Sequence, residues 1–507
     1  MQLVNFVLAA SPILIVLIGI MTFKKPAMKV APVALLVTII LAFTYFNTED
    51  ASVSENTDMV LSLLWKGVVE GGKIVAMIFG AFVTLNTLKA TGAMEDVKNT
   101  VSRISHDRRV QIVIVGMMVP IFLEGAAGAG APAAIAAPFL VALGFNPITS
   151  IAVALLGDAT PCSWGGAGLT TISGGDALVS AGLSTTMLNS AMVGRIHMFG
   201  VLIIPFIIIW LAFGRKGFKG IVPYLFYAGF TTGLVMFLLS NYVGPEVTSM
   251  GTGLISILLS VGYVKVFKIK TPEEYKYEFP ENMVSKYKPL VAMSPYFYML
   301  VLLPLVRYTV PLSILTAYGY ITWVDCVIFI CAMLGAATLR VTPKEFLKTC
   351  GTTIKGVMPV LVTMGSLLVV AYVMQQPSTG MIKLLASDLA DAAGNLYPAA
   401  SVFIGSLGSF ITGTGLGSNI MFAPMHINAA SSLSVNPVTV FAGQNAGASL
   451  GNLICPNNTV AACATVGEVG NENKVMRKTF VAFGIIVLEY MVLTMIYTFV
   501  LFPNFGI

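Results

Sequence analysis

The 507-residue chain is hydrophobic at 56% of its positions and charged at only 10%, and its mean hydropathy is +0.86. A water-facing surface of ordinary polarity cannot be built from that composition, which excludes a soluble globular protein. The net charge of +6 lies in short loops instead of a basic stripe with aromatic residues, so we expect no nucleic-acid partner. The six cysteines lack the paired spacing of zinc or redox sites, and we expect no metal and no cofactor.

Apolar segments recur from Leu3 to Phe502 with no long polar domain between them. A helix that crosses a bilayer needs about 20 apolar residues, and the sequence predicts about 12 to 14 such segments. Lys24, Lys25 and Lys29 follow the first segment, and the positive-inside rule places them in the cytoplasm. We therefore predict an all-α, multi-pass protein of the bacterial plasma (inner) membrane, in contact with lipid, with its N-terminus outside.

The remaining loops agree with this topology. The loop at 47–58 is acidic and falls outside. The basic loops can all be cytoplasmic if the intervening chain makes even numbers of crossings; they lie at 95–109, 215–219, 265–288, 340–355 and 474–478. Glu70 and Lys73, three residues apart on one helical face, predict an ion pair.

The first break in the apolar pattern is rich in glycine and proline. It reads FLEGAAGAGAPAAIAAPFLVALGFNP from Phe122 to Pro147 and continues through LLGDATPCSWGGAG to Gly168. Glu124 falls at membrane depth, where a lone carboxyl group is costly and functional by default. Burial favours its neutral form, so we predict a proton carrier; a carboxylate held for structure alone is the alternative. Asp158 predicts a second proton site, a cation ligand or a helix N-cap.

The next candidate residues lie in the segment AMVGRIHMF. The planar guanidinium of Arg195 suits a carboxylate, so we predict that it binds the substrate or pairs with Glu124 or Asp158. An arginine at the membrane interface is the alternative. His197 predicts a proton relay, and His426 has a similarly apolar context; a hydrogen-bonded core histidine is the commoner outcome for both.

A second break repeats the first. It reads FITGTGLGSNIMFAPMHINAASSLSVNP from Phe410 to Pro437 and continues through GQNAGASLGNLICPNNT to Thr459. Glu124-Gly125 and Asn146-Pro147 in the first break match Thr412-Gly413 and Asn436-Pro437 in the second at a nearly constant offset. Because the loop charges orient the two copies oppositely, we predict inverted repeats at about 60–213 and 345–502, linked by scaffold helices at 220–340 within one domain, 1–507.

The glycine runs predict broken or re-entrant hairpins whose half-helix N-termini offer N–H groups to an anion. Irregular backbone at membrane depth is tolerated only against protein or a water-filled cavity, which favours a binding site; close helix packing through small residues is the alternative. Polar side chains in the second break suit an anion, or sodium; capping of the broken helices is the alternative. The predicted substrate contacts are Gly125, Gly128, Gly130, Arg195, Thr412, Gly413, Gly415, Ser418, Asn419, Asn445 and Asn457.

Five stretches resemble the lactate permease family of bacterial membrane transporters. They are FLEGAAGAGAP at Phe122–Pro132, GFNP at Gly144–Pro147, MVGR at Met192–Arg195, SFITGTGLGSN at Ser409–Asn419 and CPNNTVAACATVG at Cys455–Gly467. The resemblance covers most of the chain. It implies proton-coupled uptake of short 2-hydroxymonocarboxylates such as lactate and glycolate, on a fold like other inverted-repeat, ion-coupled carriers.

We therefore predict a secondary transporter, a symporter and not an enzyme, in which a protonated carboxyl group offsets the charge of the incoming anion. A carrier of another carboxylate or a sulfonate, coupled to a proton or to sodium, is the main alternative. An aspartyl intramembrane protease is a remote one: Asp158 and Asp176 resemble its motifs, but that chemistry needs two carboxyl groups at close range and Asp176 lies in a polar stretch. An ion channel is disfavoured, because half-helices around a closed site suit occlusion. The sequence leaves homo-oligomer formation open.

Overall fold

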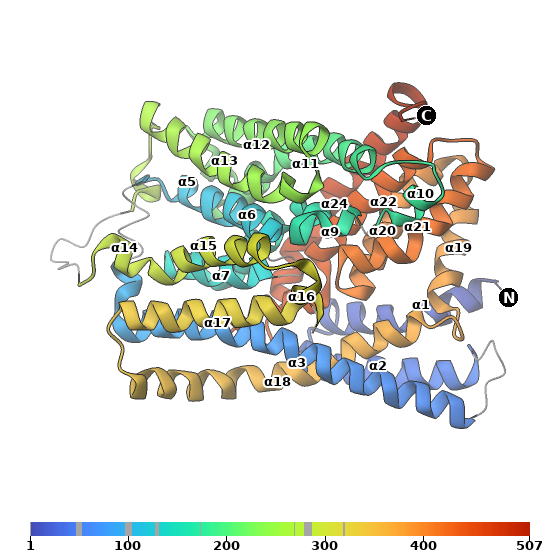
Figure 1. The fold of residues 1–507 in the computed structure, drawn as a ribbon, viewed down its shortest axis with the longest axis horizontal. Coiled ribbons are helices and arrows are strands. Elements are labelled where there is room, and N and C mark those ends of the chain that lie inside the picture. The colour runs from blue at the N-terminus through green and yellow to red at the C-terminus, as the bar shows by residue number, and fades with distance from the viewer. Residues whose placement is uncertain are drawn as a thin grey trace.

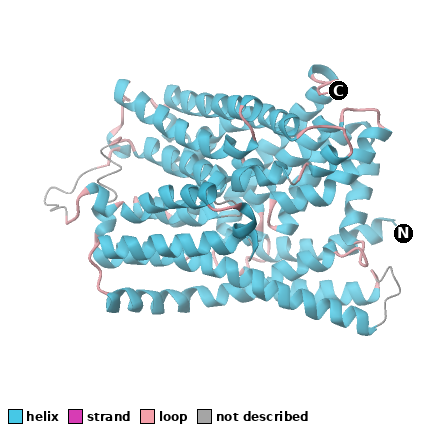
Figure 2. Cartoon of the chain, in the orientation of Figure 1, coloured by secondary structure: helices cyan, strands magenta, loops and turns pink. Residues whose placement is uncertain are grey.

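The structure, a computed structural model, describes residues 2–46, 53–96, 104–126, 131–172, 174–267, 269–277, 286–317 and 320–506. Over these ranges the chain folds into helices joined by short loops (Figure 2). The β pairing within them is a single bridge between Asp107 and Lys276. The predicted all-α, polytopic class is confirmed.

Seven helices of the described chain are long and apolar enough to cross a membrane. They lie within α1 (Gln2–Met21), α2 (Ala27–Thr44), α3 (Val53–Thr91), α11 (Thr186–Phe213), α12 (Val222–Tyr242), α13 (Pro245–Val266) and α24 (Glu472–Ile496). Five shorter apolar helices lie within α7 (Ala131–Ala142), α8 (Pro147–Ala159), α15 (Ser294–Thr309), α17 (Tyr320–Thr338) and α18 (Pro343–Gln375). The apolar segments of the sequence thus appear as helices of the described chain.

Short helices and turns fill the spaces between the long helices. The helices are α5 (Arg108–Val113), α6 (Val119–Ala126), α9 (Gly165–Ile172), α10 (Asp176–Ser180), α14 (Pro289–Ala292), α16 (Leu312–Ala317), α19 (Met381–Ala393), α20 (Tyr397–Thr412), α21 (Gly415–Ser432), α22 (Pro437–Ile454) and α23 (Pro456–Val466). The tighter or wider turns are η1 (Ile114–Met118), η2 (Pro161–Trp164), η3 (Arg215–Phe218), η4 (Glu273–Tyr275), η5 (Gly394–Leu396) and η6 (Tyr497–Leu501).

The long helices α3 and α18 run side by side in opposite directions along the long axis of the molecule (Figure 1). Small residues permit this approach: a Cβ added at Gly71 would lie 3.2 Å from the backbone nitrogen of Gly365. On α3, Glu70 and Lys73 form the predicted ion pair, at 2.8 Å. The antiparallel course of α3 and α18 agrees with opposite orientations for the two halves, and the repeat boundaries stay a prediction.

Elements from both glycine-rich stretches pack together at the centre of the bundle. In the first half, α6 and α9 pack against α13 of the predicted scaffold, and α13 packs against α12. In the second half, α20, α21 and α22 pack on one another, and α22 packs on α24 (Figure 1). Contacts between the halves join α11 to α22, α9 to α21, and α7 to α23. The two stretches therefore share one core.

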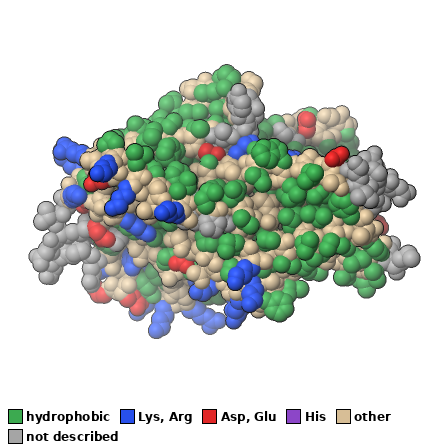
Figure 3. All heavy atoms as spheres, turned by 90° about the horizontal axis from the view of Figure 1, so that it is seen from below, with side chains coloured by type: hydrophobic (Ala, Val, Ile, Leu, Met, Phe, Trp, Pro, Cys, Tyr) green, Lys and Arg blue, Asp and Glu red, His purple; other side chains and the backbone are tan. Residues whose placement is uncertain are grey.

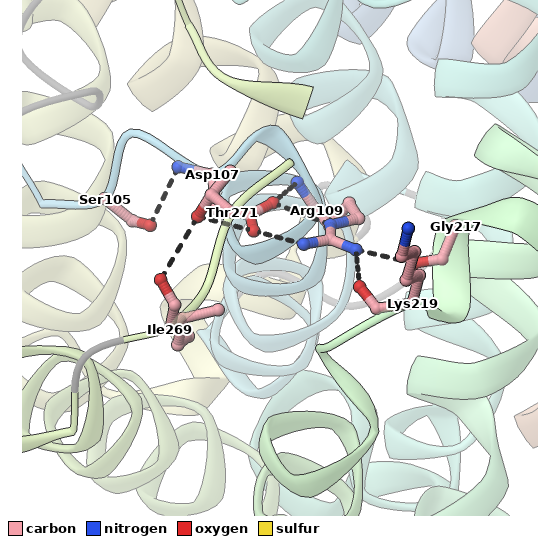
Figure 4. Close-up of polar contacts among 7 residues, drawn as sticks. All are labelled: Ser105, Asp107, Arg109, Gly217, Lys219, Ile269 and Thr271. Atoms are coloured by element: carbon pink, nitrogen blue, oxygen red, sulfur yellow. Dashed lines mark hydrogen bonds and ion pairs between the residues drawn. The ribbon is translucent and has the colours of Figure 1, made fainter. Parts of the chain in front are cut away.

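A buried ion pair fixes one end of the bundle (Figure 4). Arg109 donates from Nη2 to Oδ2 of Asp107 at 2.6 Å and from Nε to Oδ1 at 2.9 Å. Its Nη1 donates to the carbonyl oxygens of Gly217 and Lys219, and Thr271 donates to Asp107 Oδ2 at 3.0 Å. Because both charged side chains are at most 1% exposed, their hydrogen bonds must replace water on every side.

These contacts bring several of the predicted basic loops to the same end of the molecule. Residues 104–109, 215–219 and 269–277 meet around the ion pair, and Lys286 donates to the carbonyl of Thr91 at the end of α3. In Figure 3, Lys and Arg side chains gather toward one end of the visible face, while hydrophobic side chains cover much of the rest. The shared end agrees with loops on one side of a membrane. Which side that is stays a prediction.

Candidate functional site

The second glycine-rich stretch breaks into two helices at Gly413. α20 ends at Thr412, and Gly413 follows it with a left-handed φ of 78°, which a glycine adopts without strain. Thr414 then caps α21, because its Oγ1 accepts a hydrogen bond from the N–H of Gly417 at 2.9 Å. The broken hairpin expected from the sequence is present, and its second arm begins at Gly415.

The first glycine-rich stretch separates α6 from α7. Residues 127–130 between these helices lie outside the described part of the chain, and with them the predicted contacts Gly128 and Gly130. Gly125 lies in α6, pressed against the backbone of Met250 in α13, where an added Cβ would collide. At this position the small residue permits close helix packing.

The two Asn-Pro motifs have the same structural role. Asn146 accepts a hydrogen bond from the N–H of Thr149 at the start of α8, and Asn436 accepts one from Val438 at the start of α22. In both helices proline stands at the first helical position, where its missing N–H costs nothing. Equivalent caps at positions matched in the sequence support the predicted duplication.

A cavity of about 110 Å³ lies between the two broken segments. Its lining comes from both: Glu124, Cys162, Gly165, Gly166, Leu169, Thr170, Thr414, Gly415, Leu416 and Asn452. Benzene fills an apolar cavity of about 150 Å³, so this space suits a solute of a few heavy atoms. α9 begins at Gly165 and α21 at Gly415, so two helix N-termini border the cavity and present the positive ends of their dipoles to an anion.

Glu124 and Asp158 form a buried carboxyl pair at this cavity. They are 2% and 3% exposed, and their side chains lie within hydrogen-bonding reach of one another. Glu124 Oε2 and Asp158 Oδ1 accept no hydrogen bond from any N–H or O–H group of the described residues. Two ionised carboxylates in such contact would repel, whereas one shared proton turns the contact into a hydrogen bond. The pair has the geometry of a proton-binding site.

Close packing of backbone against backbone places Asp158 beside Glu124. Its neighbour Gly157 lies against the carbonyl oxygen of Gly116, and a side chain at position 157 would collide with that backbone. Gly116 belongs to the π turn η1, which interrupts the helical run leading into α6 and Glu124. Such single π turns are frequent at functional sites.

Polar side chains of α22 hold the turn η2 and the start of α9. Ser449 Oγ accepts from the N–H of Ser163 at 3.0 Å. Asn445 donates to Thr171 Oγ1 at 2.8 Å, and Thr171 donates to the carbonyl of Ser163 at 2.6 Å. Asn452 donates to Cys162 Sγ. Asn445 therefore joins the two halves of the site from behind the cavity wall.

His197 is fully buried beside this turn. Its Nε2 lies 2.7 Å from Ser163 Oγ, and its Nδ1 lies 2.7 Å from the hydroxyl of Tyr490. Both ring nitrogens thus have neutral partners, an arrangement typical of a histidine that supports a core. The contact with Ser163 nevertheless places it one residue from the cavity-lining Cys162, and its predicted role as a proton relay stays a prediction.

The second half has a similar histidine. His426 lies between the Tyr397 hydroxyl at 2.7 Å and Gln444 Oε1 at 2.8 Å. Gln444 in turn donates to Ser418 Oγ at 2.9 Å, so the predicted contact Ser418 supports α21 from inside the core. Asn419, also buried, donates to the carbonyl of Thr170 at 3.3 Å. It therefore reaches the wall of the cavity from behind.

Arg195 is not brought to the carboxyl pair. Its guanidinium donates to the carbonyl of Ala191 one turn earlier and lies over the rings of Phe237, Phe502 and Phe505, 4.6 to 5.7 Å from their centroids. No described carboxylate makes an ion pair with it. These contacts suit the interfacial arginine that the sequence left as an alternative.

Asn457 lies next to the hairpin turn at Gly413, and its Oδ1 has no hydrogen-bond partner among the described residues. Thr412, the other predicted contact at this turn, uses its hydroxyl to accept the N–H of Thr414 at 3.2 Å and so helps to shape the break. Of the predicted residues, Glu124 and Gly415 line the cavity directly.

The sequence-based prediction missed most of the wall that α9 and η2 contribute, including Cys162, Gly165 and Thr170, and it missed Asn452 on α22. Their signal was weak but present. PCSWGGAG interrupts an apolar run with small and polar residues, and Asn452 follows a run of glycine, alanine and serine in α22. Such interruptions mark places where backbone approaches backbone or a cavity.

Alanine at position 165 is expected to lower transport by about tenfold or more, since a methyl group there would overlap Glu124 Oε1 and take up space in the cavity. Uptake of labelled substrate into proteoliposomes measures the effect. Gly484→Ala is the matched control, because nothing lies within 4 Å of a Cβ at that position. If the two variants were equally active, the cavity would not be part of the transport site.

Comparisons with known proteins identify the family of the chain. The family profile of L-lactate permease matches residues 5–323 and 300–502. Glycolate permease GlcA of Escherichia coli K12 is 26% identical over 93% of this chain and 91% of its own length. L-lactate permease of Halalkalibacterium halodurans is 26% identical over 96% of this chain and 95% of its own length.

Among solved structures, the YdaH transporter of Alcanivorax borkumensis aligns with 93% of this chain and 98% of its own, at 13% identity and a TM-score of 0.37. The family profile covers nearly the whole chain, from the first helix to α24. The chain therefore belongs to the L-lactate permease family of multi-pass membrane proteins.

Proposed function

We propose that this protein is a symporter that carries lactate or glycolate together with a proton across the bacterial plasma membrane. The observation that carries the proposal is the Glu124–Asp158 pair at the wall of a small cavity that both broken segments line. An intramembrane carboxyl group is costly and is seldom retained without a function. Here Glu124 lines the space for a solute, and Asp158 adjoins Glu124.

The geometry provides a reason to couple the two solutes. A carboxylate substrate brings one negative charge into a site that already holds two carboxyl groups. With both carboxyl groups ionised, repulsion would exclude it; each proton bound by the pair removes one negative charge. The N-termini of α9 and α21 then offer the anion partial positive charge without an arginine or lysine in the cavity lining. Anion and proton are therefore expected to enter as a unit.

The proposed substrate follows from the volume of the cavity and from the names of the related permeases. A cavity of about 110 Å³ favours a solute of a few heavy atoms. The relatives that align over most of the chain are named as permeases for glycolate and for L-lactate. Both are short 2-hydroxymonocarboxylates, whose hydroxyl group suits polar side chains such as Thr170 and Asn452 in the wall. A small sulfonate or another carboxylate is the second candidate, because the helix N-termini would attract any small anion.

Proteolysis has less support. The carboxyl neighbour of Asp158 is Glu124, whereas Asp176 is exposed at the start of α10. An aspartyl protease needs a pair that a peptide and a water molecule can reach together. The cavity beside Glu124 has room only for a much smaller molecule.

Uptake into proteoliposomes tests the proposal. Labelled lactate, glycolate and a short sulfonate are each offered under an imposed proton gradient or an imposed sodium gradient. We expect lactate or glycolate to accumulate under the proton gradient, and a protonophore to abolish the accumulation. Accumulation driven by sodium alone would contradict proton coupling, and accumulation of the sulfonate alone would contradict the substrate.

A further inference from the structure

A second, larger cavity lies outside the candidate transport site, at the end of the bundle where the basic loops meet. Its volume is about 400 Å³. The end of α3, the start of α18, the link from α17 to α18 and the segment before α14 form its walls. The lining residues are Thr87, Ala90, Thr91, Lys286, Tyr287, Leu339, Arg340, Val341, Glu345, Lys348, Thr349 and Thr352. Lactate transport assigns no role to it.

The charge of this cavity is strongly positive. Lys286, Arg340 and Lys348 contribute three cations, and none of them forms an ion pair with a carboxylate of the described residues. Among the described residues of the lining, the one acidic side chain is Glu345, whose carboxylate accepts hydrogen bonds from the N–H and hydroxyl of Thr342 in a capping box. These hydrogen bonds hold the pKa of Glu345 below its ordinary value, so it is ionised at neutral pH. Among the described lining residues, the cations therefore exceed the carboxylates by two.

A buried hydroxyl points to a bound group as well. Thr87 lines the cavity and is 2% exposed, yet its Oγ1 has no hydrogen-bond partner among the described residues. A buried hydroxyl without a partner is costly, and natural proteins usually satisfy it with a ligand, water or another side chain.

We propose that this cavity binds the phosphate headgroup of an anionic membrane phospholipid. Phosphate oxygens match cations and hydroxyl donors, and basic pockets between membrane helices are known to hold such headgroups. At about 400 Å³ the cavity is much larger than a short monocarboxylate needs.

The adjoining surface favours a lipid over free phosphate. α18 leaves the cavity with an exposed apolar face made of Leu347, Ile354, Met358 and Val362, each 46 to 69% exposed. Their spacing keeps them on one side of the helix, next to the face that carries Lys348. Acyl chains along this face would hold a headgroup at the cavity. Such a lipid would fill the space where α3, α17 and α18 meet.

Binding of short-chain lipids to the purified full-length protein in neutral detergent tests the proposal. Dioctanoyl phosphatidylglycerol is titrated while the thermal unfolding midpoint is recorded, with dioctanoyl phosphatidylcholine and inorganic phosphate in parallel. We expect phosphatidylglycerol to raise the unfolding midpoint at concentrations where phosphatidylcholine and inorganic phosphate have little effect. Arg340→Gln with Lys348→Gln is expected to raise the half-saturating concentration about tenfold.

The matched control is Arg215→Gln with Lys216→Gln, which removes the same two charges from exposed positions on η3 at the same end of the bundle. Thr87→Val tests the hydroxyl without changing charge, and we expect a shift of about threefold to tenfold. An equal loss in the control pair, or an equal response to phosphatidylcholine, would overturn the proposal. A response to inorganic phosphate that needs Arg340 and Lys348, without a response to the lipid, would overturn the lipid as occupant.

Discussion

Glu124→Gln is expected to abolish uptake driven by a proton gradient while it preserves exchange of substrate across the membrane. Glutamine has the size of glutamic acid and donates a hydrogen bond to Asp158 as a protonated Glu124 would, but it has no proton to release. Net cotransport requires release, whereas exchange of a bound anion for another does not. The expected loss of gradient-driven uptake is on the order of a hundredfold or more, the scale on which a positioned proton-transfer group acts.

The two assays use the same proteoliposomes. Counterflow of labelled lactate against unlabelled lactate reports on binding and movement, and accumulation under an imposed proton gradient reports on coupling. Asp176→Asn is the control, because that carboxylate is exposed at the start of α10 and touches neither the cavity nor the pair. Should Glu124→Gln accumulate lactate as the parent protein does, Glu124 is not the coupling site; should counterflow vanish too, its role lies in binding.

The breaks in the helices could be predicted because they depend on local chemistry. Glycine and proline interrupt helices wherever they cluster, and asparagine before proline caps the next helix. The structure accordingly breaks the second stretch at Gly413 and begins helices after Asn146 and Asn436. Membrane helices were predicted for the same reason, since their length and polarity are properties of contiguous residues.

The composition of the cavity could not be predicted, because its contacts join residues far apart in the sequence. Asn452 meets Cys162 only after α22 has packed against η2. Arg195 illustrates the same dependence on residues far apart in the sequence. Its charge favoured a carboxylate partner, but Phe502 and Phe505, near the opposite end of the chain, cover its guanidinium instead. Residue type restricts what a side chain can bind, and tertiary packing selects among the possibilities.

Asp107→Asn is expected to destabilise the protein more than any substitution of a surface charge. It would leave the guanidinium of Arg109 buried with its charge uncompensated. Removing one partner of a buried pair costs about 3–5 kcal/mol of unfolding free energy. We expect a value near 3 kcal/mol, because the carbonyl oxygens of Gly217 and Lys219 still accept hydrogen bonds from Nη1. Equilibrium unfolding in mixed micelles measures the change.

An exposed ion pair of the same chain serves as the control for Asp107→Asn. Glu273 and Lys276 form an ion pair at the same end of the molecule, but the side chain of Glu273 is 79% exposed, so Glu273→Gln is expected to cost less than about 1 kcal/mol. A second variant isolates the charge: Asp107→Ser with Arg109→Met keeps an N-cap for α5 and removes both buried ions. Because an uncompensated charge is the largest cost, this double variant is expected to be more stable than Asp107→Asn alone. If it is instead the less stable of the two, the hydrogen bonds from Arg109 to the loop carbonyls, and not the neutralisation of its charge, are what hold this end of the bundle together.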